Sequence, residues 1–285
     1  MSAICHLWTN TPDCRKSKRS RQNGVAGVFK INGREKMALR KLLYTPSGKA
    51  GEYANKAYAA NIFNGCTHGC KYCYVPSFLK MGSDKKETFE RIVSPVPDLY
   101  ARLEKDLKRL GEIDEPIFLC FTCDPYPEDL MVSSYTRDVI AMILDSGNSV
   151  NILTKAGTRA VRDFDMLCMD KKNRIGATLT FIDPFLSSTW EPRAASPVNR
   201  VEMLRQAKER GIHTWASVEP VIVPSESLKI IELASPYVDE FKVGKWNYDK
   251  RSNAIDWHGF VYDVVSLLEK IGKKYTIKED LKKYI

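Results

Sequence analysis

The sequence lacks any long apolar run: none approaches the about 20 residues that a membrane-spanning helix needs. Its first residues also lack the charged and then apolar pattern of a secretory signal peptide. The chain contains no internal repeat and no low-complexity tract. We therefore expect a globular protein without a membrane partner.

Cysteine is scarce for a disulfide scaffold, with eight cysteines in 285 residues and none beyond Cys168. Secreted domains that depend on disulfides are short and much richer in cysteine. Because a cluster of thiolates also needs a reducing compartment, we expect a cytoplasmic protein. With 44% hydrophobic residues, the chain can bury a large core in one catalytic domain that carries an arm.

The net charge of +9 lies entirely in the first part of the chain. Residues 1–60 hold 12 Lys and Arg against 3 Asp and Glu, whereas the remainder is balanced. Such a basic run is often a solvated tail, but it is also what a phosphate backbone attracts. We predict contact with DNA or RNA through the densest group of basic residues, which is Arg15, Lys16, Lys18, Arg19 and Arg21.

From residue 59 onward, short apolar runs alternate with longer amphipathic stretches. This alternation predicts βαβ units with a parallel sheet, which is an α/β fold. We divide the chain into a basic N-terminal extension, residues 1–55, which we expect to be partly disordered, and a catalytic domain, residues 56–285. The expected strands are 59–63, 117–122, 149–153, 174–181, 212–218 and 238–243, and the expected helices are 86–111, 133–146, 158–170, 198–210, 225–234 and 257–271.

Cysteines with the spacing C-x3-C-x2-C stand in the segment Cys66–Cys73. Iron–sulfur cubes are held by cysteine thiolates, ordinarily four of them, so a set of three leaves one iron open. An open metal position usually marks a reactive site. The alternatives are a zinc site with His68 or a distant cysteine as fourth ligand, or a group of packed thiols.

The surroundings of these cysteines resemble the radical S-adenosylmethionine (SAM) superfamily, and within it the spore photoproduct lyase-like group, which is often labelled DNA repair photolyase-related. The resemblance covers about residues 44–248, and its motifs follow one another in the family's order. The motifs that carry it are Asn61–Pro76, Phe121–Tyr126, Leu153–Lys155 with Arg162–Asp163, Leu179–Phe181 with Trp190–Ala194 and Arg200, and Val218–Val221.

This resemblance implies a partial (β/α)6 barrel of the TIM type, with a [4Fe–4S] cluster on Cys66, Cys70 and Cys73. It implies that the open iron binds SAM, which one electron from an external donor splits to a 5′-deoxyadenosyl radical. It further implies that Tyr72 packs on the adenine of SAM and that Lys155 pairs with the methionyl carboxylate. Without the resemblance, Tyr72 is equally a core tyrosine and Lys155 a surface lysine.

Other polar residues follow the expected strands, where a barrel enzyme keeps its chemistry. Asp124 can hold the ammonium or ribose of the cofactor, although Asp-Pro also simply begins turns. Glu219 ends the fifth expected strand and can contact cofactor or substrate. The remaining candidates for cofactor binding are Thr178, Thr180, Glu191 and Arg200. The threonines can instead satisfy the barrel interior, and the last two residues can instead pair with each other.

One position departs from the family. In the lyase, a cysteine that gives a hydrogen atom to the substrate precedes the Thr-x-Asp of the second strand, whereas Phe121 stands here. We take Cys123, and after it Cys120, as candidate hydrogen-atom donors, with packed thiols as the alternative. Because residues three apart on an extended strand point to opposite faces, we expect these two thiols not to chelate together.

The leading hypothesis is therefore a radical SAM enzyme that acts on a nucleic acid or nucleotide. The alternatives are radical modification of a peptide or small metabolite, and a non-enzymatic nucleic-acid-binding protein with a structural metal. The absence of cysteine after Cys168 argues against peptide-modifying enzymes with extra C-terminal clusters. The sequence leaves open the substrate atom, the fate of SAM, the oligomeric state and the roles of Cys5, Cys14 and Cys168.

Overall fold

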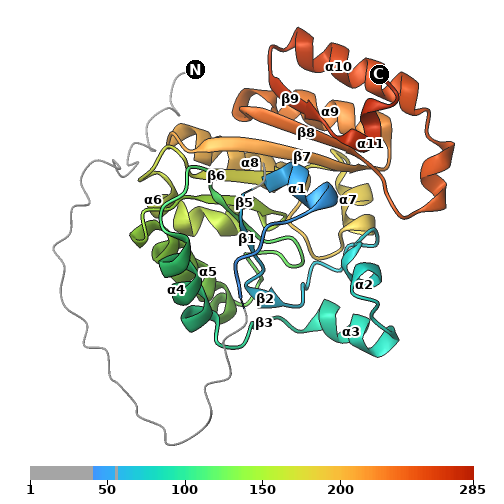
Figure 1. Ribbon diagram of the computed structural model, residues 1–285. Coiled ribbons are helices and arrows are strands. Elements are labelled where there is room, and N and C mark those ends of the chain that lie inside the picture. Colours follow the sequence, from blue (N-terminus) through green and yellow to red (C-terminus); the bar gives the residue numbers. More distant parts are fainter. Residues whose placement is uncertain (1–40, 55–56) are drawn as a thin grey trace, which may run out of the picture. The chain divides into compact units, whose positions relative to one another are not determined.

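The computed structural model describes residues 41–54 and 57–285, all within the compact unit Leu39–Ile285. The basic residues predicted to contact nucleic acid lie outside the described residues. The centre of the unit is a parallel sheet in the order β1-β4-β5-β6-β7-β8-β9 (Figure 1). Its strands are β1 Ala59–Ala60, β4 Ile117–Leu119, β5 Val150–Thr154, β6 Arg174–Thr178, β7 His213–Val221, β8 Glu240–Lys245 and β9 Lys274–Ile277.

The parallel α/β sheet expected from the sequence is confirmed, and β9 joins the six expected strands as a seventh. Each connection moves one strand along the sheet, so the order in space follows the order in the chain. The first and last strands of this sheet, β1 and β9, are its edges and are not paired with each other. The described sheet therefore corresponds to a partial barrel that stays open between β1 and β9.

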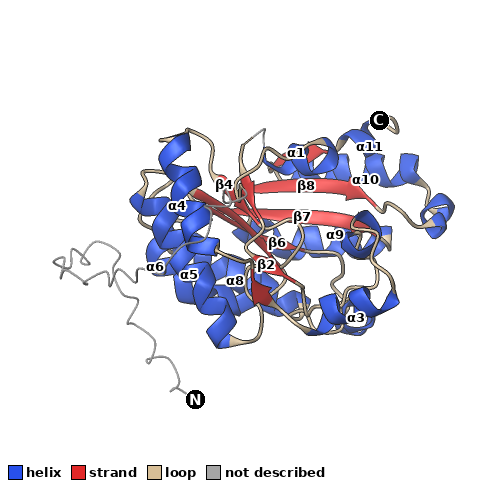
Figure 2. Ribbon diagram, turned by 60° about the horizontal axis from the view of Figure 1, so that its bottom comes forward, coloured by secondary structure: helices blue, strands red, loops and turns tan. Residues whose placement is uncertain are grey.

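Helices connect the strands and lie against the sheet (Figure 2). None of the helices among the described residues has the length and hydropathy that crossing a membrane requires. The longer helices are α4 Leu99–Leu110, α5 Leu130–Asp145, α8 Pro197–Glu209, α9 Pro224–Ala234 and α10 Trp257–Lys270. The shorter elements are α1 Gly48–Ala54, β2 Phe63–Asn64, α2 Val75–Phe78, α3 Ser83–Arg91, β3 Ser94–Pro95, η2 Gly157–Asp163, α6 Phe164–Leu167, α7 Pro184–Trp190, η3 Ser235–Tyr237, η4 Lys250–Ala254 and α11 Glu279–Lys282.

Side-chain caps fix where several helices begin. The carboxylate of Asp129 accepts hydrogen bonds from the N–H groups of Met131 and Val132 at the start of α5. Ser196 accepts one from Asn199 at the start of α8, where a proline follows directly. Short polar residues at these positions satisfy backbone donors that have no partner inside the helix.

Alternation along the strands separates two hydrophobic clusters. Outward-facing residues such as Leu119, Ile152 and Val218 belong to the large cluster that the helices cover. Inward-facing residues such as Phe118 and Trp215 form a smaller cluster with Tyr53, whose side chain comes from α1. Successive residues of a strand point to opposite faces, so the second cluster lies on the inner face of the sheet.

Several expected elements differ in the structure. The strand expected over 59–63 is divided into β1 and β2, which lie in different sheets, and the helix expected over 158–170 is the 3-10 helix η2 followed by the short helix α6. The helix expected over 86–111 is divided into α3 and α4, because the intervening segment pairs its Ser94–Pro95 strand with β2 and contains prolines that cannot continue a helix. The strand expected over 117–122 ends at Leu119. The boundary expected between residues 55 and 56 remains a prediction, although Leu42, Leu43 and Tyr53 are already buried in the hydrophobic clusters.

The segment before β1 reaches across to the opposite edge of the sheet. In α1, Lys49 forms an ion pair of 2.9 Å with Asp280, which follows β9. The carboxylate of Glu52 accepts a hydrogen bond of 2.9 Å from the Glu279 N–H. The Tyr53 carbonyl accepts a bond of 3.1 Å from the buried ammonium of Lys242 on β8. Helix α1 therefore connects the two edges that have no shared backbone ladder.

Candidate active site

The cysteines of the predicted motif lie on one loop, Cys66–Cys73, which follows β2. Gly65 has a φ of +88°, and a Cβ at this position would lie 1.9 Å from the Ile92 carbonyl oxygen. Only glycine combines this backbone conformation with such a close approach. The Cys66 N–H then donates a hydrogen bond of 2.8 Å to the Phe89 carbonyl. The chain is thus turned and tied to α3 just where the loop begins.

Arg193 holds the middle of the loop. Its guanidinium donates hydrogen bonds to the carbonyls of Thr67 and, at 2.9 Å, of Glu90. Its backbone N–H donates to the His68 carbonyl at 3.2 Å. Gly69 leaves room for this side chain, because a Cβ there would lie 2.6 Å from an Arg193 nitrogen. Sequence reasoning missed this role, since the motif that contains Arg193 does not identify its partners.

The thiols of Cys66, Cys70 and Cys73 are all free. Burial raises the pKa of the Cys66 thiol to about 12, and it also raises the pKa of Cys70 and of Cys73. Metal binding to such thiols must displace their protons. Within 41–54 and 57–285, no group of three His, Cys, Asp or Glu side chains is gathered as a single metal ion requires. A cubane has its irons at separate corners, so its thiolates need not converge on one point.

A group of charges lies beside the loop, in which Glu191 and Arg200 are buried and Lys155 is half-buried. The ammonium of Lys155, directly after β5, is 5.7 Å from the centre of the Tyr72 ring. The Tyr72 hydroxyl donates a hydrogen bond to Glu191, and the other carboxylate oxygen pairs with Arg200 at 2.5 Å. Burial alone would lower the pKa of Lys155, but Cys70 and Glu191 raise it above its ordinary value. The structure therefore brings together four residues that the sequence singled out.

Arg200 is fully engaged within the protein. Besides pairing with Glu191, it donates hydrogen bonds to the carbonyls of Ala195 at 2.8 Å and Thr178 at 2.9 Å. Burial alone would raise the pKa of Glu191, but Arg200 and Lys155 lower it, so the carboxylate remains ionised at neutral pH. Of the two alternatives considered for Glu191 and Arg200, the structure contains the mutual pair.

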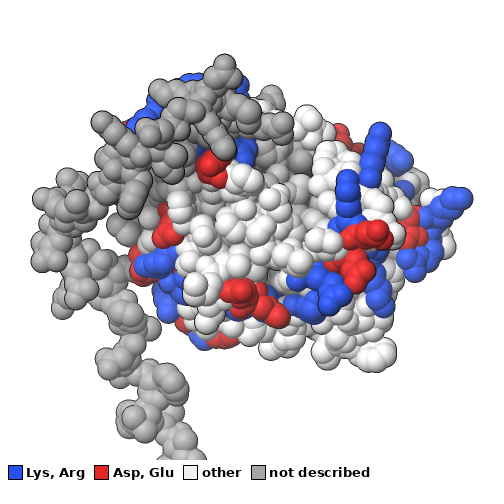
Figure 3. Space-filling view, turned by 90° about the horizontal axis from the view of Figure 1, so that it is seen from below, with Lys and Arg blue, Asp and Glu red and all other residues white. Residues whose placement is uncertain are grey.

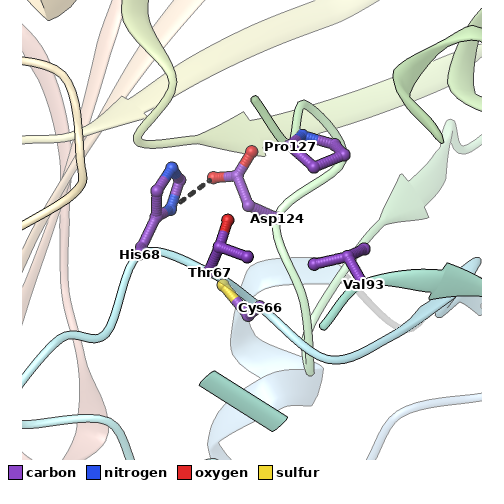
Figure 4. Close-up of a pocket in the computed structure, with 6 residues that line it drawn as sticks. All are labelled: Cys66, Thr67, His68, Val93, Asp124 and Pro127. Carbon is purple, nitrogen blue, oxygen red and sulfur yellow. Dashed lines mark ion pairs between the residues drawn. The ribbon is translucent and has the colours of Figure 1, made fainter. Parts of the chain in front are cut away.

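Asp124 connects the ends of two neighbouring strands to the cysteine loop (Figure 4). Its carboxylate accepts hydrogen bonds from the Thr154 hydroxyl at 2.7 Å and the Lys155 N–H at 2.8 Å, and lies 3.5 Å from His68 Nδ1. Burial alone would raise the pKa of Asp124, but hydrogen bonds from the Lys155 and Tyr126 N–H groups and from the Thr154 hydroxyl lower it. Burial lowers the pKa of His68 to about 4, so its ring is neutral at pH 7. The other ring nitrogen lies 3.1 Å from Arg159, so His68 contacts protein groups on both sides.

The polar groups of Thr180 and Glu219 differ in whether the protein provides a hydrogen-bond or ion-pair partner for them. Thr178 ends β6 and is buried, whereas the fully buried hydroxyl of Thr180 has no hydrogen-bond partner within residues 41–54 and 57–285. An unsatisfied buried hydroxyl costs free energy that a ligand can recover. Glu219 on β7 already pairs with Lys278 at 2.8 Å and accepts a hydrogen bond from the Tyr53 hydroxyl. Neither partner of Glu219 was predicted, because both lie far from it in the sequence.

The expectation that Cys120 and Cys123 do not chelate together remains a prediction, but the extended strand on which it was based does not reach them. Strand β4 ends at Leu119, so the alternation of an extended strand does not continue through these residues. A hydrogen bond with Cys120, together with burial, raises the pKa of the Cys123 thiol. Both thiols are free and buried, and they lie next to each other at the end of the strand.

The chain belongs to the Radical SAM superfamily, which it matches over residues 60–235. Enzymes of this superfamily use SAM and a [4Fe–4S] cluster, and the protein is a radical SAM enzyme. The family resemblance predicted from the cysteine loop and the motifs that follow it is confirmed.

Two proteins are similar to this chain in sequence. The protein ORF301 of Acidianus two-tailed virus is 27% identical over 268 residues, which cover 86% of this chain and 85% of the relative. The protein MJ0683 of Methanocaldococcus jannaschii is 26% identical, with 58% of this chain and 60% of the relative covered. Both relatives are described as uncharacterized, so they carry no reaction over to this chain.

Solved structures share the fold. A variant of spore photoproduct lyase with bound SAM and dinucleoside spore photoproduct has a TM-score of 0.62 at 14% identity, and the match covers 88% of this chain and 87% of the lyase. SuiB of Streptococcus suis bound to SAM has a TM-score of 0.55 at 12% identity, with 77% of this chain and 50% of SuiB covered. At such low identity, these likenesses concern the fold.

Proposed function

We propose that this radical SAM enzyme holds a [4Fe–4S] cluster on Cys66, Cys70 and Cys73 and acts on a nucleic acid or nucleotide. The observation that carries the proposal is a loop with three free thiols that stands beside the half-buried cation Lys155. When bound, cluster and SAM together supply reductive cleavage to a 5′-deoxyadenosyl radical. Reduced thiolates also favour the cytoplasm as the location.

The residues around the loop have separable roles in this proposal. Lys155 binds the methionyl carboxylate, and Tyr72 packs against the adenine while Glu191 holds its hydroxyl. The free hydroxyl of Thr180 donates to the cofactor. Asp124 and Arg200 position strand ends and the loop through their many protein partners. Glu219, held between Lys278 and Tyr53, faces the substrate side.

The Lys155→Met variant is expected to lose about 10- to 100-fold in SAM affinity while keeping its iron, because a hydrogen bond to a charged group contributes ~1.5–3 kcal/mol. Equilibrium dialysis with labelled SAM measures the change. The exposed Lys171 provides the matched control, Lys171→Met, which should bind as the wild type does. Unchanged affinity in Lys155→Met would remove this lysine from the cofactor site.

Cys123 is proposed as the hydrogen-atom donor, with Cys120 beside it as a second thiol. A Cys123→Ala variant is expected to cleave SAM but to change the product distribution or the deuterium that the product takes up from heavy water. Mass spectrometry of the products measures both quantities. Wild-type products from the single variants of both cysteines would make them ordinary packed thiols.

The substrate class rests on the basic arm and on the fold shared with a lyase that is bound to a dinucleoside photoproduct. Deleting residues 1–23 is expected to flatten the salt dependence of oligonucleotide binding, which falls by roughly 0.7–0.9 log units per log unit of salt for each phosphate neutralised. Fluorescence anisotropy on single- and double-stranded oligonucleotides across a salt series measures this slope. The control is 5′-deoxyadenosine formation without substrate, which should persist after the deletion.

Absence of oligonucleotide binding by the full-length protein at low salt would contradict the nucleic-acid substrate. The substrate would then be sought among peptides, since SuiB, which shares the fold, has been seen bound to its precursor peptide SuiA. Iron and sulfide analysis after anaerobic reconstitution separates both enzyme hypotheses from a non-enzymatic protein with a structural metal.

A further inference from the structure

A cluster of aromatic and cationic side chains lies where the connection from β8 to α10 meets the end of α7. The rings of Trp190 and Trp246 contact each other edge to face, with their centroids 5.4 Å apart. The guanidinium carbon of Arg251 lies 5.0 Å from the centre of the Trp190 ring and 4.9 Å from the centre of the Trp246 ring. We call these three residues the indole–arginine platform.

Arg251 is anchored by the protein but remains accessible to solvent. The carboxylate of Asp249 accepts hydrogen bonds from its Nε at 2.9 Å and from its Nη2 at 2.6 Å. The Arg251 side chain is nevertheless 64% exposed, and within residues 41–54 and 57–285 its Nη1 donates no hydrogen bond. A guanidinium that is already anchored loses little side-chain entropy when it binds a planar ring or a phosphate.

Tyr248 presents a further ring on the same connection. It is 82% exposed, and the ammonium of Lys49 lies 5.6 Å from its ring centre. Its backbone φ is +64°, a left-handed conformation that is uncommon for a bulky residue. The fold thus leaves this ring in water on a strained backbone, and residues of this kind concentrate at binding sites.

The platform adjoins the candidate active site. Trp190 directly precedes Glu191, whose carboxylate accepts the hydrogen bond from Tyr72. The Trp190 carbonyl accepts a hydrogen bond of 2.8 Å from the Lys71 N–H of the cysteine loop. The two connections that form the platform follow the parallel strands β6 and β8. A ligand that rests on the platform therefore lies at the edge of the sheet where a barrel enzyme keeps its chemistry.

The charge of this part of the chain favours a single strand over a duplex. Residues 61–285 carry as many acidic as basic residues. On the face that Figure 3 shows, basic side chains stand among acidic ones beside a broad described area without charge, so that face presents no continuous basic track to a phosphate backbone. Stacking requires no net charge, but it requires the face of a base, which is accessible only where the base is unpaired.

We propose that the indole–arginine platform and Tyr248 bind an unpaired stretch of the nucleic-acid substrate. Bases stack on the Tyr248 ring and on the Arg251 guanidinium, and a phosphate accepts hydrogen bonds from the Nη1 of Arg251. The inference rests on the proposed function, because it names the form in which that substrate is held, a single strand of DNA or RNA. No covalent bond forms or breaks in this step.

The stacking part is tested on Tyr248 with a labelled oligothymidylate and the reconstituted full-length protein. Fluorescence anisotropy is measured at a salt concentration that weakens the contribution of the basic arm. Tyr248→Ser is expected to raise the dissociation constant about 5- to 150-fold, because it removes one stacking ring. Tyr248→Phe, which keeps the ring, should bind as the wild type does. The matched control is Tyr262→Ser, which removes an exposed ring from α10 and should leave binding unchanged.

Arg251 separates stacking from charge. Arg251→Lys keeps the charge but loses the planar group, so it should weaken binding at least about 5-fold without changing the slope of the salt dependence. Arg251→Ala should weaken binding and also lower that slope by roughly 0.7 log units per log unit of salt, which corresponds to one phosphate of a single strand. Arg205→Lys on α8 is the control and should behave as the wild type does.

The outcomes distinguish this inference from the function on which it rests. Equal binding of the oligothymidylate by the wild type, Tyr248→Ser and Arg251→Lys would overturn the platform and leave the nucleic-acid substrate in place. An equally large loss on the duplex with oligodeoxyadenylate would also overturn it, since paired bases offer no free face. If the wild type binds neither oligonucleotide even at low salt, the nucleic-acid substrate itself fails and the inference fails with it.

Discussion

Replacing any one of Cys66, Cys70 and Cys73 by alanine is expected to abolish SAM cleavage and most iron binding. A cluster that has lost one of three thiolates keeps only two protein ligands. Two irons would then lack a protein ligand, so the single open iron that binds SAM would no longer be defined. Iron and sulfide content after anaerobic reconstitution, with 5′-deoxyadenosine formed under reductant, measures the loss. The expected fall in 5′-deoxyadenosine is at least a thousandfold, to the level without enzyme.

Cys120→Ala is the matched control for iron content, because Cys120 is a buried free thiol outside the loop. It should retain iron and sulfide as the wild type does. A single loop variant that keeps a full cluster and cleaves SAM would show that the thiolates are assigned wrongly. Zinc in place of iron in the anaerobically purified wild type would favour the structural alternative.

Arg200→Met is expected to destabilise the protein strongly. It would leave the Glu191 carboxylate buried without its cation, and removing one partner of a buried pair typically costs about 3–5 kcal/mol. Urea unfolding measures the free energy of unfolding. Arg205→Met is the control in the same helix, since Arg205 is solvated and pairs with Glu202 and Glu209 at the surface. Its effect should be small, because surface pairs contribute little.

The pH dependence checks the same pair independently. Arg200 and Lys155 hold the pKa of Glu191 below its ordinary value, although burial opposes them. A carboxyl group with a lowered folded pKa stabilises the protein above its unfolded pKa, and this stabilisation is lost as pH falls through the folded value. Acid should therefore weaken the wild type more than Arg200→Met/Glu191→Gln. Equal acid sensitivity, or wild-type stability of Arg200→Met, would show that the pair does not hold the fold together.

Strand positions were predictable because strands buried on both faces read as continuous apolar runs. The runs around Ile117, Ile152, Ile175 and Val218 therefore lie in strands of the structure. Boundaries were less predictable, since β4 stops at Leu119 although the apolar and cysteine residues continue beyond it.

The positions of the candidate site residues at strand ends were predictable from the sequence, but their contacts were not. Thr154 and Lys155 at the end of β5 are examples of the first kind. The contacts of Arg193 with Thr67 and of Glu219 with Tyr53 span 126 and 166 residues of sequence, and no local spacing encodes such contacts. The same holds for the neighbouring thiols of Cys120 and Cys123, whose approach depends on where the strand ends.

The contacts of helix α1 limit the order in which the fold can form during synthesis. Its contacts are with Glu279 and Asp280, and the Tyr53 hydroxyl shares Glu219 with Lys278. A nascent chain has all of α1 outside the ribosome long before these partners emerge. The inner aromatic cluster around Tyr53 can thus acquire its ionic surroundings only after the last strand has been added, which makes completion of the site one of the final events of folding.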